Sequence, residues 1–254
     1  MISGYNKFHK GKDAVIFIME ICVLGASGFI GRNIVKYFGA VGITRRDLNL
    51  IDFSAVDVFF KNNLQIKFVI HCASVGGWRH TADPMDTVEQ NIRTFMNVVE
   101  AAGPERKGIW FSSGAADATP TTRYGFSKYV IERLAAGYPN VDVLKIWGCW
   151  GADEPPTRFI TTCLREKHVN IPEDKYFDFF HIDDVCKVVK YCIKSPQKQA
   201  FNLVYEEKLR LSDVARKIGV EYTVHSRGPD YVGQFNLDQE LYKRMPLNKC
   251  IPNC

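Results

Sequence analysis

Short runs of consecutive apolar residues alternate with longer segments in which apolar residues recur every three or four positions. The runs cover residues 21–24, 68–70, 109–111 and 141–147. Unbroken apolar character is expected of strands that are covered on both faces, as in a parallel sheet. Helical spacing is seen at Phe29, Ile30, Ile34, Val35 and Phe38, and again at Val88, Ile92, Phe95, Met96 and Val99. This alternation predicts an α/β fold with a doubly wound parallel sheet.

Three glycines lie where the first apolar run passes into the first helical segment. Gly25, Gly28 and Gly31 permit a tight turn and a close backbone approach to a pyrophosphate at the helix N-terminus. The strand before the motif and the helix after it are the context that such a turn requires. We therefore expect a Rossmann-type dinucleotide site that includes Gly25, Ser27, Gly28, Phe29, Ile30 and Gly31.

The end of the second predicted strand carries a basic sequence. Thr44, Arg45 and Arg46 stand about twenty residues after the first glycine, where an acidic side chain would bind the ribose of NAD and a basic one the 2′-phosphate of NADP. This favours NADP. Asp47 leaves NAD open, because a rotated loop could offer its carboxylate to the ribose.

Tyr124 and Lys128 lie four residues apart in a segment with helical spacing, so their side chains share one face. We expect the ammonium to lower the pKa of Tyr124 from its reference value of ~10 toward working pH. Such a phenol can pass a proton to a carbonyl oxygen while hydride reaches the carbon. Ser112 and Ser113 end an apolar run at the sheet edge where ligands bind, so a hydroxyl there could bind the same oxygen.

The pattern becomes irregular beyond about residue 150, with prolines at 155, 156 and 172, and helical spacing returns at 185–193 and 211–218. We expect residues 19–150 to form the NAD(P)-binding core. Residues 151–254 are expected to form a small substrate-binding lobe over the carboxyl ends of the strands, with elements that return to the core. Residues 1–18 are interpreted as an N-terminal extension, because cleavage after the apolar run that follows them would destroy the glycine motif.

Composition narrows the class of partner. The 254 residues are 46% apolar, which suffices for one sizeable core. The net charge of +5 is not concentrated in any basic run, which argues against nucleic acid and is compatible with an anionic small ligand. Apolar stretches stay below the ~18 residues of a membrane span, so we expect a cytoplasmic protein with no membrane partner.

The cysteine and histidine patterns do not predict a metal site. Six of the eight cysteines lie in apolar runs, and no CxxC pair occurs in the sequence. Cys250 and Cys254 could pair or bind metal, but a reduced tail is the favoured interpretation. His181 precedes Asp183 and Asp184 without other spaced ligands, so we expect it at the start of a helix.

Several motifs occur in the order found in one enzyme family. They are the glycine motif at 25–31, His71-Cys-Ala-Ser74, Asn91, Phe111-Ser-Ser113, Tyr124-Gly-Phe-Ser-Lys128 and Phe180-His-Ile-Asp-Asp-Val185. From Met19 almost to the C-terminus the chain resembles the extended short-chain dehydrogenase/reductases, the family of nucleotide-sugar epimerases, dehydratases and reductases. Within it, segments 46–52, 56–60 and 74–77 look most like GDP-fucose synthase and the related 4-keto-6-deoxysugar nucleotide reductases.

The resemblance implies roles for individual residues. Asp52 would face the adenine, and the cofactor's ribose and phosphates would lie along Cys72, Ala73 and Ser74. Asn91 would support the same site. The catalytic residues would be Ser113, Tyr124 and Lys128, with Lys128 also holding the nicotinamide ribose. A homodimer through the Tyr124 helix and the 88–99 helix is typical of the family, and light scattering that showed a monomer at micromolar concentration would remove this expectation.

The chain also departs from its relatives. Ala115 and Arg158 stand where GDP-fucose synthase has the Cys and His that it uses in epimerisation. Phe177 replaces a common Arg, and Gly148 replaces a common Asn. The stretch between the catalytic Ser and Tyr is shorter than usual, which implies a more open pocket. A loop with Trp78, Arg79 and His80 would either lean over the nicotinamide or stay exposed.

Taken together, these features predict an NADP(H)-dependent reductase of a nucleotide-linked 4-keto sugar. An epimerase or dehydratase of the same family is the nearest alternative; it would keep its NAD(P) bound and show no net consumption of NADPH. A non-catalytic NADP-binding sensor is a second alternative, because a fold does not determine a function.

Overall fold

The computed structural model describes residues 19–78, 81–238 and 241. The expected extension at 1–18, the loop residues Arg79 and His80, and the pair Cys250 and Cys254 lie outside the described residues. In chain order the elements are β1 (Ile21–Leu24), α2 (Phe29–Phe38), β2 (Val41–Ile43), α3 (Phe53–Asn62), β3 (Phe68–His71), α4 (Thr87–Ala102), β4 (Lys107–Ser113), α5 (Ala115–Ala118), α6 (Arg123–Ala136), β5 (Val141–Ile146), β6 (Cys149–Trp150), α7 (Phe159–Arg165), β7 (His168–Asp174), β8 (Tyr176–Phe177), β9 (Phe180–His181), α8 (Ile182–Lys194), β10 (Ala200–Leu203), β11 (Leu209–Arg210), α9 (Leu211–Ile218) and β12 (Glu221–Arg227).

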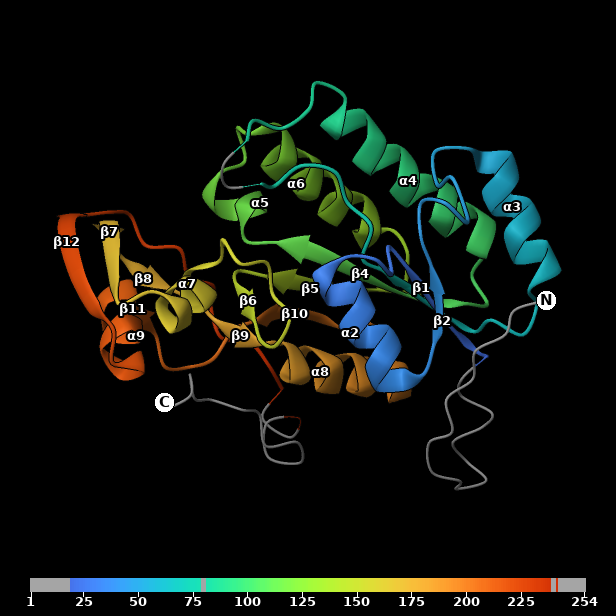
Figure 1. Ribbon diagram of the computed structural model, residues 1–254. Helices are drawn as coiled ribbons and strands as arrows, with labels where there is room; N and C mark the ends of the chain where they lie inside the picture. Colours follow the sequence, from blue (N-terminus) through green and yellow to red (C-terminus); the bar gives the residue numbers. More distant parts are fainter. Residues whose placement is uncertain (1–18, 79–80, 239–240, 242–254) are drawn as a thin grey trace.

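A six-stranded sheet with the order β10-β5-β4-β3-β1-β2 forms the centre, and each neighbouring pair in it is parallel. Helices α2 and α8 cover one face, and α3, α4 and α6 cover the other (Figure 1). This confirms the predicted doubly wound α/β fold. The strand order reverses between β1 and β3, and such a switch point is where open α/β sheets bind ligands.

The unbroken apolar run of β1 is explained by burial on both faces. Its four side chains are fully buried. Ile21 and Val23 join the apolar cluster that includes residues of α2 and α8. Cys22 and Leu24 join a separate cluster with residues of α3 and α4. Successive side chains therefore point to opposite helical layers, as the two-residue repeat of a strand requires.

A second apolar centre lies in the C-terminal part of the chain, at the left of Figure 1. Trp150, Ile160, Ile171 and Val214 belong to this cluster, which α7, α9 and β7 surround. β7 pairs in parallel with β12. Residues 182–203 instead return to the main sheet, where α8 packs into the first cluster and β10 pairs with β5.

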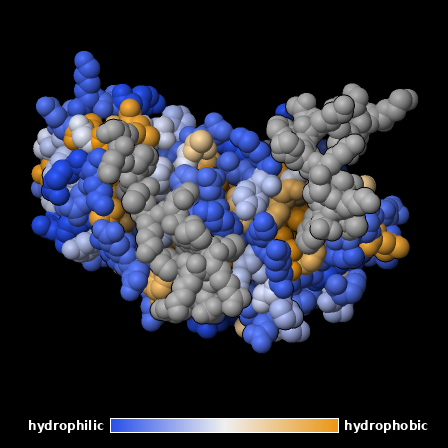
Figure 2. All heavy atoms as spheres, turned by 90° about the horizontal axis from the view of Figure 1, so that it is seen from below, coloured by the Kyte–Doolittle hydropathy of each residue, from blue (hydrophilic) through white to orange (hydrophobic). Residues whose placement is uncertain are grey.

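The face on which α8 lies is viewed from below in Figure 2. Its described surface is mostly hydrophilic, and apolar residues form a few separate groups on it. Among the described residues, none of the helices combines the length and the apolar character needed to span a membrane.

Asp174, at the end of β7, is linked to α9 by hydrogen bonds, so replacing it tests the packing of the C-terminal part. Its buried carboxylate accepts hydrogen bonds from the Ser212 backbone N, at 3.0 Å, and from the Ser212 hydroxyl, at 2.9 Å. Asp174→Ala should lower the free energy of unfolding by about 1–3 kcal/mol, because it leaves two donors at the start of α9 without an acceptor. Chemical denaturation measures the change. The matched change Glu173→Ala, at an exposed neighbour, should cost less than about 0.5 kcal/mol; equal losses would contradict this assignment.

Candidate active site

The glycine turn after β1 depends on close backbone packing. Gly25 has a positive φ of 81°, and a Cβ on it would come within 2.5 Å of the Ala73 backbone N. A Cβ on Gly31 would come within 2.3 Å of the Gly25 carbonyl oxygen. Helix α2 begins after Gly28 without a side-chain capping bond, so its first backbone N–H groups are left for an anion. The turn therefore fits the pyrophosphate of a dinucleotide.

A cavity of about 460 Å³ lies at this turn, at the switch point of the sheet. Its volume is within the range of small-molecule sites. The predicted cofactor residues that line it are Gly25, Ser27, Gly28, Thr44, Arg45, Cys72, Ala73, Ser74 and Asn91.

The remaining predicted cofactor residues lie elsewhere. Ile30 lines a second, larger cavity, while Phe29 packs against the main core. Arg46 does not line the first cavity. Asp52 does not line it either: its carboxylate accepts a hydrogen bond from the Ala55 backbone N at 3.1 Å and caps α3. Residues 48–51, which directly precede Asp52, line the first cavity instead.

The two candidate ribose contacts after β2 differ in their surroundings. The Arg45 guanidinium donates a hydrogen bond to the Gln90 side-chain oxygen at 3.2 Å, and both residues line the cavity. The Asp47 carboxylate accepts bonds from the Thr44 backbone N, at 2.8 Å, and from the Thr44 hydroxyl, at 2.6 Å. These bonds lower the pKa of Asp47. The acidic side chain is thus turned back onto its own loop, whereas the basic one borders the cavity.

The second cavity has a volume of about 1,050 Å³ and shares Cys72, Ser74 and Trp78 with the first. The sheet edge and α6 contribute Ser113, Tyr124 and Lys128 to its wall. Arg158, Lys175, Phe177 and Tyr231 line it from the C-terminal part of the chain. The three predicted catalytic residues therefore lie together, next to the glycine-turn cavity.

Tyr124 is held between two serines. Part of its side chain faces the cavity, yet protein surrounds the hydroxyl closely enough that burial raises the pKa of Tyr124 to about 12. Hydrogen bonds with Ser113 and Ser74 and the charge of Arg158 act in the opposite direction. The phenol is therefore protonated at neutral pH, as a proton donor must be before it reacts.

The expected lowering of this pKa by Lys128 is not what the structure shows. The Lys128 ammonium lies 5.4 Å from the centre of the Tyr124 ring and donates a hydrogen bond to the Phe111 carbonyl oxygen at 3.0 Å. Burial lowers the pKa of Lys128 itself to about 8. Desolvation, and not the ammonium expected from the four-residue spacing, thus sets the direction of the shift in the pKa of Tyr124.

The structure distinguishes the two serines at the end of β4. The Ser112 hydroxyl is buried and donates a hydrogen bond to the Glu132 carboxylate. Ser113 reaches the Tyr124 phenol, and its hydroxyl also accepts a bond from the Ala115 backbone N at 3.2 Å. Of these two serines, Ser113 is thus the one that lies beside the phenol.

Asn91 holds the segment that follows β3. Its side-chain oxygen accepts a bond from the Val75 backbone N at 2.8 Å, and its amide donates to the Val75 carbonyl at 2.9 Å. The amide also donates to the Ser127 hydroxyl at 2.9 Å. Asn91 therefore fastens this segment to α6, in addition to bordering the first cavity.

The two departures at positions 148 and 177 are physically linked. A Cβ on Gly148 would lie 2.6 Å from a ring carbon of Phe177 and 2.1 Å from the Asp178 carbonyl oxygen. The Phe177 ring stacks on Tyr231 with centroids 5.2 Å apart. Trp147 extends this aromatic wall, with its ring 5.1 Å from that of Tyr231. Sequence reasoning missed Tyr231 and Lys175, because both lie in irregular segments without a motif.

His181 has the structural position that was expected. It precedes the first residue of α8, and its Nδ1 accepts a hydrogen bond from the Asp183 backbone N at 3.3 Å. Within the part of the chain that the structure describes, His, Cys, Asp and Glu side chains form no group that could hold a metal ion.

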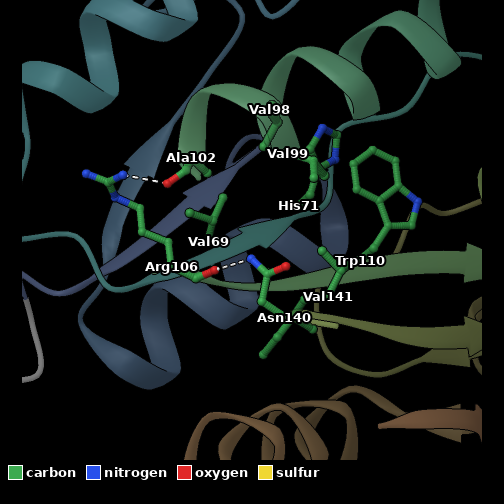
Figure 3. Close-up of a pocket in the computed structure, with 11 residues that line it drawn as sticks. Val69, His71, Val98, Val99, Ala102, Arg106, Trp110, Asn140 and Val141 are labelled. Atoms are coloured by element: carbon green, nitrogen blue, oxygen red, sulfur yellow. Dashed lines mark hydrogen bonds between the residues drawn. The ribbon is translucent and has the colours of Figure 1, made fainter. Parts of the chain in front are cut away.

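A third cavity, of about 20 Å³, lies between α4 and the sheet (Figure 3). His71 lines it and packs against Trp110 with ring centroids 3.7 Å apart and the rings tilted by 35°. Burial lowers the pKa of His71 well below its ordinary value of 6.5. This histidine is therefore a neutral packing residue, and the cavity holds at most a water-sized molecule.

The buried ammonium predicts a pH dependence of stability. The pKa of Lys128 falls from an ordinary 10.5 to about 8 on folding, so the unfolded chain binds more protons between these pH values. We expect the wild-type chain to gain free energy of unfolding relative to Lys128→Met as the pH rises from about 8 to 10.5. Denaturation of both proteins across this range tests the sign; a difference that does not change with pH would contradict it.

Comparisons with known proteins identify the family and the fold. The model of the NAD dependent epimerase/dehydratase family matches residues 21–204. The chain is similar in structure to a dTDP-4-dehydrorhamnose reductase ortholog of Clostridium acetobutylicum, with a TM-score of 0.70 and 18% identity over 89% of this chain and 92% of that one. It is also similar to dTDP-glucose 4,6-dehydratase of Bacillus anthracis in complex with NAD, with a TM-score of 0.70, 14% identity and coverage of 88% and 90%.

A third similar structure is the enzyme WbmG of Bordetella bronchiseptica in complex with NAD and UDP, with a TM-score of 0.72, 18% identity and coverage of 92% of this chain and 89% of that one. At these identities the structural likeness shows a shared fold. Since the family match spans more than half of its length, the chain belongs to the NAD-dependent epimerase/dehydratase family, which comprises NAD(P)-dependent oxidoreductases and epimerases of the short-chain dehydrogenase/reductase superfamily.

Proposed function

We propose that this protein is an NADP(H)-dependent reductase of a nucleotide-linked 4-keto sugar. The observation that carries the proposal is the meeting of the Tyr124, Ser113 and Ser74 hydroxyls where the glycine-turn cavity joins the larger one. A carbonyl carbon beside the phenol would then lie at the boundary between a cofactor cavity and a substrate cavity. Among the similar structures, a dTDP-4-dehydrorhamnose reductase and an enzyme in complex with NAD and UDP support a nucleotide-sugar substrate.

The side chains of this protein would position the substrate carbonyl and supply the proton that its oxygen takes up. The bound dinucleotide supplies the hydride. Tyr124 donates a proton to the carbonyl oxygen, and the Ser113 hydroxyl orients that oxygen by a hydrogen bond. The Lys128 ammonium lies 5.4 Å from the centre of the Tyr124 ring, where its charge would help to stabilise the phenolate that proton donation leaves. Its pKa of about 8 keeps most of it charged at neutral pH.

The walls of the two cavities suit anionic ligands. Arg45 borders the glycine-turn cavity beyond the end of β2, where a 2′-phosphate would lie. Arg158 and Lys175 add positive charge to the larger cavity, in which a diphosphate would lie. These cations support NADP(H) over NAD(H) and a nucleotide-linked sugar over a neutral one.

Reduction is favoured over the alternatives by particular residues. Ala115 and Arg158 stand at the positions from which GDP-fucose synthase epimerises, and alanine carries no group that could exchange a proton. A non-catalytic sensor would not need a phenol that is hydrogen-bonded to two serine hydroxyls, as Tyr124 is. Net consumption of NADPH separates a reductase from an epimerase or dehydratase, which would regenerate its cofactor.

Replacing the phenol tests the proton donor. Tyr124→Phe should reduce turnover by about 10²- to 10⁴-fold, because the ring stays while the proton source is lost. Its affinity for NADPH, measured by fluorescence titration, should change little. Tyr129→Phe, an exposed tyrosine on the same helix, provides the control and should keep full turnover. Unchanged turnover in Tyr124→Phe would exclude this role.

Replacing Arg45 tests the choice of cofactor. Arg45→Ala should weaken NADPH binding by roughly 10- to 100-fold, since a charge-assisted bond to the 2′-phosphate is lost, and should affect NADH far less. Calorimetric titration with both cofactors measures the ratio. Arg93→Ala, an exposed arginine paired with Glu89 on α4, is the matched control. Equal losses for NADPH and NADH would argue against a 2′-phosphate site at Arg45.

A further inference from the structure

The carboxylate of Asp83 bridges two segments that meet at the phenol. One of its oxygens accepts a hydrogen bond from the Gly77 backbone N at 2.8 Å, and the other accepts one from the Tyr124 backbone N at 2.9 Å. The Arg123 guanidinium donates to the Asp83 carbonyl oxygen at 3.0 Å. The segment after β3 is thus tied to the first turn of α6, at the residue that carries the phenol.

The bridged segment lies directly against the ring of Tyr124. A Cβ on Gly77 would come within 2.9 Å of two ring carbons of Tyr124, so only a glycine permits this approach. Gly76 and Gly77 both have positive φ, at 82° and 75°, a conformation that other residues rarely adopt. A Cβ on Gly76 would also lie 2.7 Å from an Asp83 carboxylate oxygen. The phenol is therefore packed on one side by backbone whose place depends on Asp83.

The same segment leads to the boundary between the two cavities. Trp78 follows the glycine pair and lines both cavities, while its side chain is 72% exposed. Asp83 lines the larger cavity as well. The Asp83 carboxylate thus holds Gly77 at the start of the stretch that leads to this boundary.

We propose that Asp83 is a positioning residue for Tyr124. It holds the Gly76–Gly77 backbone against the ring and fixes the start of α6, so that the hydroxyl stays aimed at the carbonyl oxygen of the substrate. This role rests on the proposed reductase function, since it acts through the proton donor of that reaction. Asp83 itself need not touch the reacting atoms.

Asparagine is the sharpest replacement, because its amide keeps one acceptor oxygen and the same shape but cannot accept both N–H bonds. Asp83→Asn should lower kcat by roughly 10- to 100-fold through misplacement of the phenol, and Asp83→Ala should lower it further. The Kd for NADPH should change by less than about threefold, because Arg45 and the glycine turn are untouched. Asp57→Asn, at a half-buried carboxylate on α3 that pairs with Lys61 and lines neither cavity, is the control and should leave kcat unchanged.

A double-mutant cycle separates positioning from a general loss of structure. If Asp83 acts through the phenol, Asp83→Asn should cause little further loss in the Tyr124→Phe background. A merely structural role would reduce kcat by the same factor in both backgrounds, and that result would overturn the proposal.

Amide hydrogen exchange provides a readout that needs no turnover. Asp83→Asn should speed exchange in residues 74–78 and 122–126, whereas Asp57→Asn should not. Faster exchange with an unchanged kcat would overturn the positioning role. If the wild-type chain reduced no keto sugar, the proposed function would be wrong. Unchanged exchange in Asp83→Asn would show separately that the Asp83 carboxylate does not hold these two segments together.

Discussion

Desolvation of the Tyr124 phenol is the constraint on which the account of this site depends. Burial raises the pKa of Tyr124 to about 12, and hydrogen bonds with Ser113 and Ser74 reduce that effect without reversing it. The phenol therefore carries its proton at neutral pH, and its later ionisation depends on the groups that hydrogen-bond to it. The same burial lowers the pKa of Lys128 to about 8, so the neighbouring ammonium is more easily neutralised than an exposed one. Both shifts follow from placing two titratable groups at a sheet edge that other elements cover.

The site is assembled by two layers of the fold that are distant in sequence. The parallel strands bring the glycine turn, Ser74 and Ser113 to one edge, because the carboxyl ends of β1, β3 and β4 are neighbours. The C-terminal part then closes the far side of the larger cavity with an aromatic wall of Trp147, Phe177 and Tyr231. Glycine at 148 makes room for this wall, so Gly148 and Phe177 meet one packing requirement.

The parts of the fold that could be predicted from the sequence are those determined by local patterns. The apolar run of β1 and the helical spacing of α2 correspond to elements buried on two faces and on one face, respectively. The glycine turn was predictable because a strand, a tight turn and a helix follow one another within a few residues. Tyr124 and Lys128 were placed on one face by the four-residue period of a helix.

What the sequence could not supply is the environment that distant segments create. Spacing suggested that Lys128 would lower the pKa of Tyr124, but burial, which depends on the whole fold, raises it. Asp52 was assigned to the adenine by resemblance; the structure shows in addition that its carboxylate caps α3, which the resemblance did not indicate. The Asp83 carboxylate binds the backbone N–H of Gly77 and that of Tyr124, which is about forty positions further along the chain. Because almost every residue has a backbone N–H, no sequence pattern indicates this contact.

The most direct test of the central claim is the stoichiometry between NADPH oxidised and sugar reduced. The purified chain would be mixed with NADPH and a panel of GDP-, UDP-, CDP- and dTDP-linked 4-keto sugars, while absorbance follows the cofactor and chromatography follows the sugar. The account predicts that one member of the panel is reduced with one equivalent of NADPH consumed per product. Conversion of a sugar without loss of NADPH, or failure of the folded chain to bind either pyridine dinucleotide at millimolar concentration, would contradict it.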